Sequence, residues 1–387
     1  MPIILTSPPP PHNPTQNLDS KSIENIIYFD IKNTQASAHA SAIVDISSIS
    51  AASFMLLYFG GSKEGARDVG IYQSFFTPSK QDGRNFGTWS EPHRLLDADS
   101  LSQMSGVFIK KLGNPITFMD TQGRAHIFVV GVSMGGWATS RIYWLMLDRK
   151  DLHTLHYVKA LHISPFLNIS HLVRTPAMLT NEGGFILPIY HELARKYPLL
   201  LTFSPQLKLD SIMRPTQMTA LLQPSFVPLS AHTSIGIYRT YKMYDNTLFV
   251  SICGSECVTK PSNLKNYDSS SVLFSMQDSI FLLHNKPSSA QGNKREELWL
   301  YRLDKVSLSD SIVHFKALFM LDNLPYSEVS YPSVAVGMES MGETIGGEFV
   351  SIAYTYGRKF IRVAFVPKSK LIAHIDSKNI ESSKDNK

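Results

Sequence analysis

Short apolar runs recur along the chain from Ile26 onward, and polar turn residues separate them. The runs alternate apolar and polar positions, or are apolar throughout, and they are rich in β-branched and aromatic residues. This pattern is typical of β-strands. Helical periodicity is weak and confined to two segments, HELARKY and SLSQM. More than fifteen strand-like runs, with Gly, Asn and Asp between them, predict an all-β barrel, sandwich or propeller.

The order of the segments favours a propeller. Each unit has an apolar strand, a turn with Gly, a second strand, and then a polar strand that ends near Trp or Pro. Repetition at a fixed length indicates a repeat architecture. Six units of about 57 residues would occupy the chain from about 26 to 367, which fits a length of 387 residues. We therefore predict one domain at residues 23–370, an all-β, six-bladed β-propeller.

The two ends of the chain differ from this domain in composition. Residues 1–22 are rich in Pro, Ser and Asn, which predicts a flexible leader, and residues 371–387 read as a polar basic tail. The first residues show neither the basic nor the apolar region of a signal peptide. No apolar run approaches the roughly 20 residues of a membrane-spanning helix. These features predict a soluble chain.

Composition and charge narrow the function only slightly. With 43% hydrophobic and 18% charged residues, the chain resembles an ordinary globular protein. A net charge of +5 suits an anionic partner such as an acidic sugar or a lipopolysaccharide surface, and equally an ordinary solvated surface. No run of Lys and Arg indicates nucleic acid. Cys253 and Cys257 could form a small disulfide but cannot make a zinc site without help, and the scattered histidines predict no metal or cofactor.

Several segments carry a family resemblance through their order and spacing. The chain reads AHASAIVDI and LLYFGGSKEGARDVGIYQS, and later LGNPITF, LLQPSFVPL, KREELWLYRL and SYPSVAV. Together these segments resemble the sialidase-like (BNR-repeat) family over nearly the whole chain. SKQDGRNFGTWSEP at 79–92 resembles a stretched Asp-box, the turn between outer strands of a sialidase blade. The resemblance implies a propeller of the sialidase type.

The resemblance also implies arginines that bind a substrate carboxylate, because a guanidinium fork matches its two oxygens. Arg239 and Arg295 fall where sialidases carry the second and third arginine. His39 stands in place of the first. A neutral histidine there could donate one hydrogen bond, and a protonated one could also supply charge.

Tyr331 matches the sialidase nucleophile. A phenol that is neutral at rest avoids repulsion with the carboxylate on the anomeric carbon of a 2-keto sugar acid. A phenol needs a base to become reactive. The resemblance places a Glu at the position of Gln223, and Gln cannot accept a proton. Glu192 or Glu328 could substitute for it.

The general acid is expected on the loop after a first-blade strand, where Glu64 and Asp68 lie. Buried together, the two carboxyl groups could share a raised pKa. We prefer Glu64 as the acid and Asp68 as a structural residue at a strand start, although the reverse order stays open. Arg174, Asn114 and Arg358 are candidate residues at the rim of the site.

Within the family, the chain is most similar to the sialidase-like subunits of bacterial Kdo hydrolases. This implies an exo-glycosidase that removes a terminal 2-keto-3-deoxy sugar acid, either Kdo from a lipopolysaccharide core or sialic acid. It also implies a membrane-protein partner that holds the soluble chain at a bacterial inner membrane. The alternative is a non-catalytic propeller subunit that binds an acidic sugar, because His39 and Gln223 replace two expected residues. A sialidase in the strict sense is the third interpretation.

Overall fold

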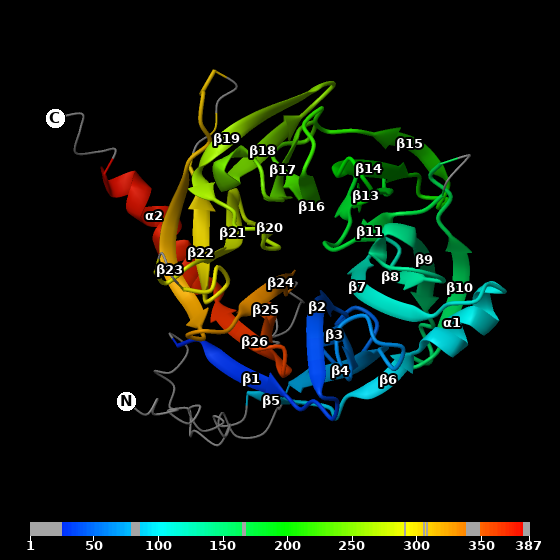
Figure 1. The fold of residues 1–387 in the computed structure, drawn as a ribbon. Coiled ribbons are helices and arrows are strands. Elements are labelled where there is room, and N and C mark those ends of the chain that lie inside the picture. Colours follow the sequence, from blue (N-terminus) through cyan, green and yellow to red (C-terminus); the bar gives the residue numbers. More distant parts are fainter. Residues whose placement is uncertain are drawn as a thin grey trace, which may run out of the picture.

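Six β-sheets arranged radially around an axis form the protein (Figure 1). The computed structural model describes residues 25–78, 86–164, 168–289, 292–304, 306, 309–337 and 349–381. Each sheet is an antiparallel blade whose first strand lies nearest the axis and whose later strands lie progressively outward. The predicted all-β, six-bladed propeller is therefore confirmed.

The first three blades contain strands β2 to β15. Blade I consists of β2 (Ser37–Asp45), β3 (Phe54–Gly61), β4 (Gly70–Pro78), β5 (Gly87–Trp89) and β6 (His93–Leu96). Blade II consists of β7 (Lys111–Met119), β8 (Ala125–Val132), β9 (Ser140–Leu147) and β10 (Leu155–Ala160). Blade III consists of β11 (His171–Val173), β12 (Met178–Leu179), β13 (Phe185–His191), β14 (Tyr197–Phe203) and β15 (Leu209–Met213).

The other three blades complete the ring. Blade IV consists of β16 (Leu221–Pro228), β17 (Ser234–Thr240), β18 (Thr247–Cys253) and β19 (Cys257–Lys265). Blade V consists of β20 (Val272–Met276), β21 (Ser279–Lys286), β22 (Glu297–Leu303) and β23 (Phe315–Asn323). Blade VI consists of β24 (Val329–Val336), β25 (Phe349–Tyr356), β26 (Phe360–Pro367) and β1 (Ile27–Ile31).

Apolar side chains fill the space between neighbouring blades. Both faces of a middle strand are covered, so β3 reads FMLLYFGG and is buried along its whole length. A separate hydrophobic cluster lies at each of the six junctions between neighbouring blades. Each blade therefore buries its two faces against its neighbours, which explains why many strands are continuously apolar instead of alternating.

The ring is closed by the first strand of the chain. β1 pairs antiparallel with β26, so that Ile27 lies opposite Phe365. Blade VI thus takes three strands from the end of the domain and one from its beginning. The sequence predicted the three later strands but not this pairing.

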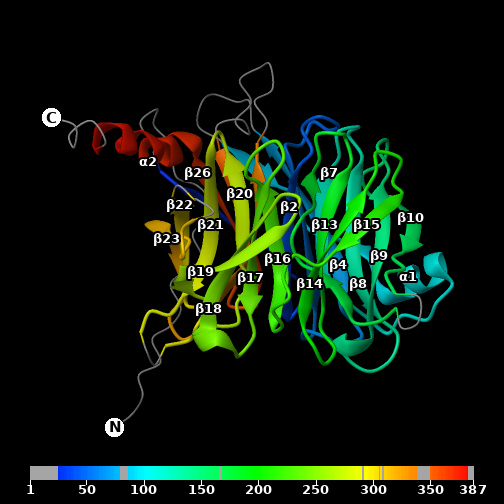
Figure 2. The same ribbon diagram turned by 90° about the horizontal axis from the view of Figure 1, so that it is seen from above.

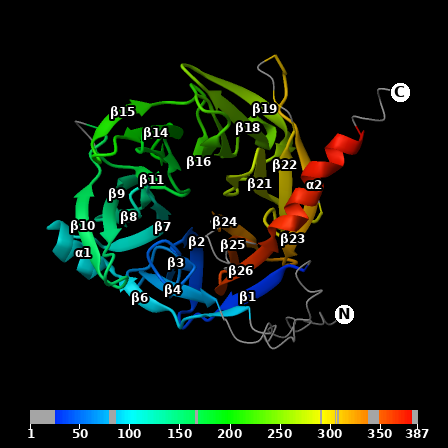
Figure 3. The ribbon, with the colours of Figure 1, turned by 180° about the vertical axis from the view of Figure 1, so that it is seen from behind.

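Two α-helices accompany the strands in the described part of the chain. α1 (Ala98–Ser105) contains the predicted SLSQM helix, and the Asp97 side chain caps it by accepting from the Ser100 amide. The second predicted helix is wrong, because HELARKY spans the end of β13, a turn and the start of β14. α2 (Lys368–Glu381) follows β26 and includes part of the segment expected to be a tail; its Leu371 is buried at the junction of blades V and VI. Figure 2 shows α2 across one end of the ring, and Figure 3 shows it crossing these two blades.

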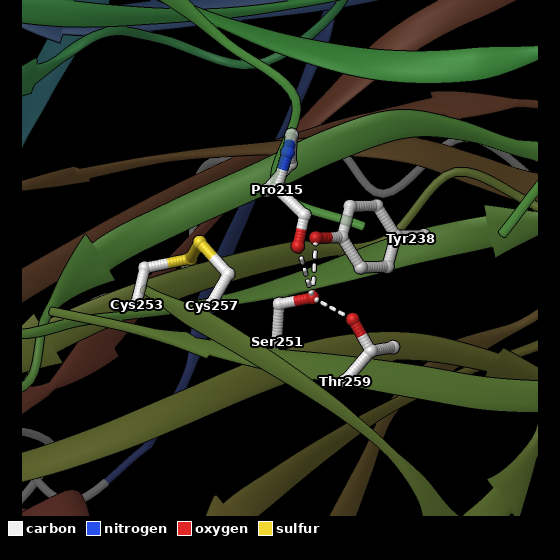
Figure 4. The surroundings of a disulfide bond; sticks show 6 residues. All are labelled: Pro215, Tyr238, Ser251, Cys253, Cys257 and Thr259. Carbon is white, nitrogen blue, oxygen red and sulfur yellow. Dashed lines mark hydrogen bonds between the residues drawn. A yellow bond between two sulfur atoms is a disulfide. The ribbon is translucent and has the colours of Figure 1, made fainter. Parts of the chain in front are cut away.

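A disulfide joins the two cysteines at the hairpin between β18 and β19. Cys253 and Cys257 face each other across the two strands, with Cα atoms 4.1 Å apart (Figure 4). Ser251 lies near them on β18 and exchanges hydrogen bonds with Tyr238 and Thr259. The disulfide links the ends of β18 and β19 in blade IV, on the periphery of the molecule.

Two sequence expectations concern residues that the structure describes only in part. The leader, residues 1–22, and residues 79–85 of the Asp-box segment lie outside the described residues. The described end of that segment forms β5, which pairs with β4. Of the helices in the described part of the chain, none is both long and apolar enough to span a membrane.

Candidate functional site

Four inner strands share a β-bulge near their starting ends. In β2, β7, β16 and β24 two residues oppose one residue of the next strand. The first residue of each bulge has a positive φ: 55° at Ala40, 31° at Asn114, 46° at Gln223 and 55° at Tyr331. Bulges re-aim side chains, and residues other than glycine adopt this conformation only where the fold enforces it. The inner strands all start at one end of the ring, which we call the entry end.

The second residue of three of these bulges is proline. Pro115, Pro224 and Pro332 directly follow the left-handed residues Asn114, Gln223 and Tyr331. Proline has no N–H to give to a β-ladder, so inside a sheet it is confined to edges and bulges. The Asn-Pro, Gln-Pro and Tyr-Pro pairs are thus the local sequence signal for the bulges that present site residues.

Tyr331 lies at the centre of an arginine cluster. Its phenol oxygen accepts a hydrogen bond from Nη1 of Arg239 at 2.9 Å. The guanidinium of Arg295 lies 5.6 Å from the centre of its ring. Asp268 orients both arginines, because its carboxylate accepts from Arg239 Nε at 2.6 Å and its backbone carbonyl from Arg295 Nη2 at 2.7 Å. The two arginines predicted from the resemblance are therefore placed beside the predicted nucleophile.

The charges around Tyr331 favour its ionised form. Burial alone raises the pKa of the phenol, but the positive charges of Arg239 and Arg295 and a hydrogen bond with Gln223 outweigh it, so that the pKa of Tyr331 lies below its ordinary value. Only 7% of the residue is exposed, which keeps solvent from screening these charges. A phenol in this setting can act as a nucleophile more readily than one in water.

His39 and Arg174 lie against the ring of Tyr331. The imidazole of His39 is 4.2 Å from it between centroids, and neither ring nitrogen has a hydrogen-bond partner among the described residues. Burial, followed by the charge of nearby arginines such as Arg358, holds the pKa of His39 well below its usual value, so the imidazole is neutral. Arg174 was expected at the rim of the site, and this is wrong: it is 2% exposed, with its guanidinium 5.0 Å from the Tyr331 ring.

Gln223 and Asn114 meet at a tyrosine that sequence reasoning missed. The hydroxyl of Tyr190, on β13, lies 3.5 Å from Gln223 Nε2 and 3.5 Å from Asn114 Nδ2. Tyr190 is 2% exposed, and burial, with the nearby charge of Glu192, raises the pKa of its phenol. Oε1 of Gln223 has no partner among the described residues. Two tyrosines with opposite pKa shifts therefore flank Gln223.

A chain of ion pairs leads from the cluster to the loop of the expected acid. Glu328 accepts from Arg295 at 3.1 Å and from Arg358 through its other oxygen. Arg358 also donates to Glu64 at 2.6 Å. Both oxygens of Glu328 are therefore occupied by arginines, which excludes Glu328 as a free base in this arrangement. Glu64 lies at the entry end, with 37% of its side chain exposed.

Asp68 is not brought into the cluster. Its carboxylate accepts from the amide and the hydroxyl of Ser62, and these bonds lower the pKa of Asp68. Glu64 and Asp68 are both exposed, so the joint burial considered for this pair does not occur. Ser62 is six residues upstream, so Asp68 ties the ends of its loop together. These bonds are compatible with a structural role for Asp68, which stays a prediction.

Glu192 lies on the loop after β13, half-buried. Burial raises the pKa of its carboxyl group, and the charges of Lys196 and Arg239 only partly oppose this. No hydrogen bond between Glu192 and Tyr331 occurs in the described part of the chain. Glu192 thus borders the cluster without contacting the predicted nucleophile.

Sequence reasoning missed two residues of the site, Asp268 and Tyr190. Asp268 has a positive φ of 57° in the segment before β20, and its neighbours in NYDSSS carry no recognisable pattern. Tyr190 precedes the HE pair of LPIYHE, in a strand that is apolar and buried over most of its length, so the sequence does not distinguish it from a core residue. Within the described ranges, no group of three or more His, Cys, Asp or Glu is arranged to hold a metal ion.

The fold and this cluster together define a six-bladed propeller of the sialidase type. The chain is similar to the Hadza microbial sialidase Hz136, with 13% identity and a TM-score of 0.60 over 88% of this chain and 68% of the other. It is also similar to Trypanosoma rangeli sialidase in complex with 2,3-difluorosialic acid, a covalent intermediate, with 12% identity and a TM-score of 0.61. That match covers 92% of this chain and 57% of the other, so the chain spans little more than half the length of the trypanosomal enzyme.

A protein of unknown function from Dyadobacter fermentans matches over its whole length. The identity is 11%, the TM-score is 0.62, and the match covers 88% of this chain and 99% of the other. No curated protein sequence matches the chain. The model of the BNR repeat-like domain matches residues 52–342. The chain belongs to the BNR repeat-like domain family.

Proposed function

We propose that the protein is an exo-glycoside hydrolase that removes a terminal 2-keto-3-deoxy sugar acid from a glycan, with Tyr331 as the nucleophile. The observation that carries this proposal is the hydrogen bond from Arg239 to the phenol oxygen of Tyr331, in a cluster that lowers its pKa. A buried tyrosine placed only for packing would have no need of a guanidinium at its oxygen and a second one over its ring. The trypanosomal sialidase captured as a covalent intermediate supports the same reaction class for this fold.

The reaction has two steps in this proposal. The phenol of Tyr331 loses its proton to solvent, its oxygen attacks the anomeric carbon, and the ketosidic bond breaks while Glu64, in its protonated form, gives its proton to the departing oxygen. Water then attacks the anomeric carbon, gives a proton to Glu64, and the bond to Tyr331 breaks. Arg358, which donates to Glu64, holds the carboxyl group at the entry end.

The arginines explain why the substrate is an acidic sugar. Arg239 donates to the phenol oxygen of Tyr331 and the guanidinium of Arg295 lies 5.6 Å from its ring, so both are near enough to the nucleophile to bind a carboxylate on the anomeric carbon. His39 replaces a third arginine with a neutral ring. Two arginines in place of three suit an acidic sugar that is also held through groups other than its carboxylate. We therefore propose Kdo of a lipopolysaccharide core ahead of sialic acid. A membrane-protein partner at a bacterial inner membrane would present the lipid-linked glycan.

The test is the release of free sugar acid. Purified protein, alone and with a candidate membrane-protein partner, is incubated with Kdo-terminated lipopolysaccharide, and free Kdo is followed by mass spectrometry. A fluorogenic sialoside is assayed in parallel, and Tyr331→Phe serves as the inactive control. Release of Kdo by the wild type but not by Tyr331→Phe supports the proposal. Cleavage of the sialoside without Kdo release would identify a sialidase instead.

The second candidate is a non-catalytic subunit that binds an acidic sugar. Gln223 favours it, since its amide cannot take a proton and Glu328 is held by two arginines. The placement of Arg239 and Arg295 around Tyr331 is compatible with both functions. Retention of Kdo by wild type and Tyr331→Phe alike, with no release of sugar under any condition, would establish the binding subunit.

A further inference from the structure

One arginine at the centre of the ring is buried with no carboxylate partner. Arg174 follows β11 in blade III; its Nη1 donates to the Ser41 carbonyl at 3.2 Å and its Nη2 to the Pro332 carbonyl at 2.9 Å. Its Nε has no hydrogen-bond partner, and no Asp or Glu among the described residues forms an ion pair with it. A buried charge that no opposite charge compensates costs free energy. Such a residue calls for an explanation beyond packing.

The side chain of Arg174 reaches across the axis of the propeller. Ser41 lies on β2 in blade I and Pro332 on β24 in blade VI, whereas Arg174 comes from blade III. Blade VI lies opposite blade III in the ring (Figure 1). Both acceptor carbonyls belong to the second residues of bulges. Arg174 therefore ties together two of the bulged strands, one of which presents Tyr331.

The guanidinium also faces the ring of Tyr331, at 5.0 Å from its centre. A cation over an aromatic face is attracted to the π-electrons, and it is attracted more strongly to a phenolate, whose negative charge spreads into the ring. Burial lowers the pKa of Arg174 to about 10, and the charge of Tyr331 partly opposes this shift. Arg174 is thus protonated at neutral pH.

We propose that Arg174 is the positioning residue that lets Tyr331 act without a carboxylate base at the position of Gln223. Its buried charge stabilises the phenolate, and its two carbonyl bonds hold the bulge that aims the phenol. The phenol proton passes to bulk water before the substrate arrives, and the resulting oxyanion attacks the anomeric carbon. This inference rests on the proposed function, since it explains how the same nucleophile is activated.

The other groups that face Tyr331 fit this assignment. They come from five further elements: His39 of β2, Glu64 after β3, Tyr190 of β13, Arg239 of β17 and Arg295 before β22. Two of them are cations, and the imidazole and the second phenol are neutral. Besides burial, the charge of Glu64 opposes the ionisation of Tyr331, and Glu64 is bound to Arg358. Among the described residues, no carboxylate or imidazole nitrogen makes a hydrogen bond with the phenol of Tyr331.

Arg174→Lys and Arg174→Met make a matched pair, because the two side chains have similar length and differ in charge. The full-length protein is labelled with [13Cζ]tyrosine, and Tyr331→Phe assigns the Tyr331 resonance. In Arg174→Met we expect Tyr331 to titrate at higher pH than in the wild type, and in Arg174→Lys to stay close to it. In Arg174→Met, kcat/KM for the sugar acid falls about 10- to 100-fold at pH 7 and recovers as the pH rises.

An unchanged titration of Tyr331 in folded Arg174→Met overturns the proposal. So does a loss of activity that is equal in both variants and independent of pH, since that pattern belongs to a purely structural residue. If neither variant folds, Arg174→Gln decides, because it removes the charge and keeps an amide that can donate to the two carbonyl groups: Tyr331 should again titrate at higher pH than in the wild type, and an unchanged titration contradicts a contribution from Arg174. The NMR titration needs no turnover, so it stands even if the wild type releases no sugar.

Discussion

Two clusters of tyrosine and arginine in this propeller have the same residue types and opposite electrostatics. In the central cluster, Tyr331 accepts a hydrogen bond from Arg239. A second cluster, which we call the rim cluster, lies between blades V and VI and consists of Tyr354, Arg362, Asp30 and Asp322. There Tyr354 donates a hydrogen bond to Asp322 at 2.6 Å. Burial and the charge of Asp322 raise the pKa of Tyr354 well above its ordinary value, whereas the pKa of Tyr331 is lowered.

The arginine of the rim cluster is fully compensated. Arg362 binds both oxygens of Asp30, at 2.6 and 2.9 Å, and reaches Asp322 at 3.1 Å. These contacts join β26 to β1 and to β23 of the next blade. In the centre, by contrast, Arg174 has no carboxylate and His39 has no partner among the described residues. Arg239 and Arg295 in the centre do pair with Asp268 and Glu328, so the difference between the clusters is the uncompensated charge of Arg174 beside Tyr331.

The largest difference should appear when the two phenols lose their hydroxyl groups. Tyr331→Phe should reduce kcat/KM by about 10³-fold or more, because the nucleophile is gone, with little change in the free energy of unfolding. Tyr354→Phe should leave kcat/KM unchanged and cost about 1–2 kcal/mol of stability, because Asp322 loses a buried donor. Sugar release and urea unfolding measure the two effects. Equal activity losses in both variants would remove the distinction.

The next effect concerns arginine geometry in the centre. Arg239→Lys keeps the charge but cannot hold Asp268 and Tyr331 at the same time, so kcat/KM should fall about 10²-fold. The matched rim variant is Arg362→Lys, which keeps a charge beside Asp30 and should retain full activity. Steady-state kinetics of the two lysine variants provide the check. A fully active Arg239→Lys would show that charge alone suffices at Tyr331.

Removal of the rim charge should affect stability alone. Arg362→Met leaves Asp30 and Asp322 without their cation in a half-buried site, which should cost about 2 kcal/mol in the free energy of unfolding. Chemical denaturation with sugar release as a second readout separates stability from function. Loss of activity in protein that is still folded would argue that the rim cluster also shapes the site.

The smallest effect is the pH dependence of stability, and its sign should differ between the two tyrosines. Tyr331 ionises at lower pH in the folded than in the unfolded chain, so it adds stability as the pH rises toward the ordinary tyrosine value near 10. Tyr354 keeps its proton when folded, so it removes stability as the pH rises above that value. The free energy of unfolding is measured against pH for the wild type, Tyr331→Phe and Tyr354→Phe. The difference between each variant and the wild type gives the pH dependence that the missing tyrosine contributes. Slopes of the same sign would contradict the contrast.

The fold could be predicted from sequence because each blade repeats the same order of apolar strand-like segments and polar turns. Strand after strand is apolar on both faces, and turns with Gly or Asn separate them. The pairing of β1 with β26 left no such record, since strand partners far apart in the chain share no local pattern. α2 was missed because its sequence, KSKLIAHIDSKNIE, reads as a polar tail with a few apolar positions.

The site was predictable where a resemblance supplied positions, and less so where contacts decide. Tyr331, Arg239 and Arg295 were predicted and do lie together. Burial makes the His39 imidazole neutral and places Arg174 inside the ring instead of at the rim. This burial depends on six inner strands from distant parts of the chain. Whether Asp68 faces the site depends on the path of one loop and its bond to Ser62.

The closure of blade VI by β1 has a consequence for biogenesis. Of the 26 strands described, β1 is synthesised first and β26 last. The pairing of Ile27 with Phe365, and with it the sheet of blade VI, can therefore form only after β26 has been synthesised. Until then the growing ring is open, and the apolar surface of blade I that blade VI will cover, which includes Phe54, Leu56 and Tyr58, is exposed. Contacts so distant in the chain make folding slow, and strand edges without partners invite association between molecules. Chaperone demand during synthesis should therefore peak just before the last three strands emerge.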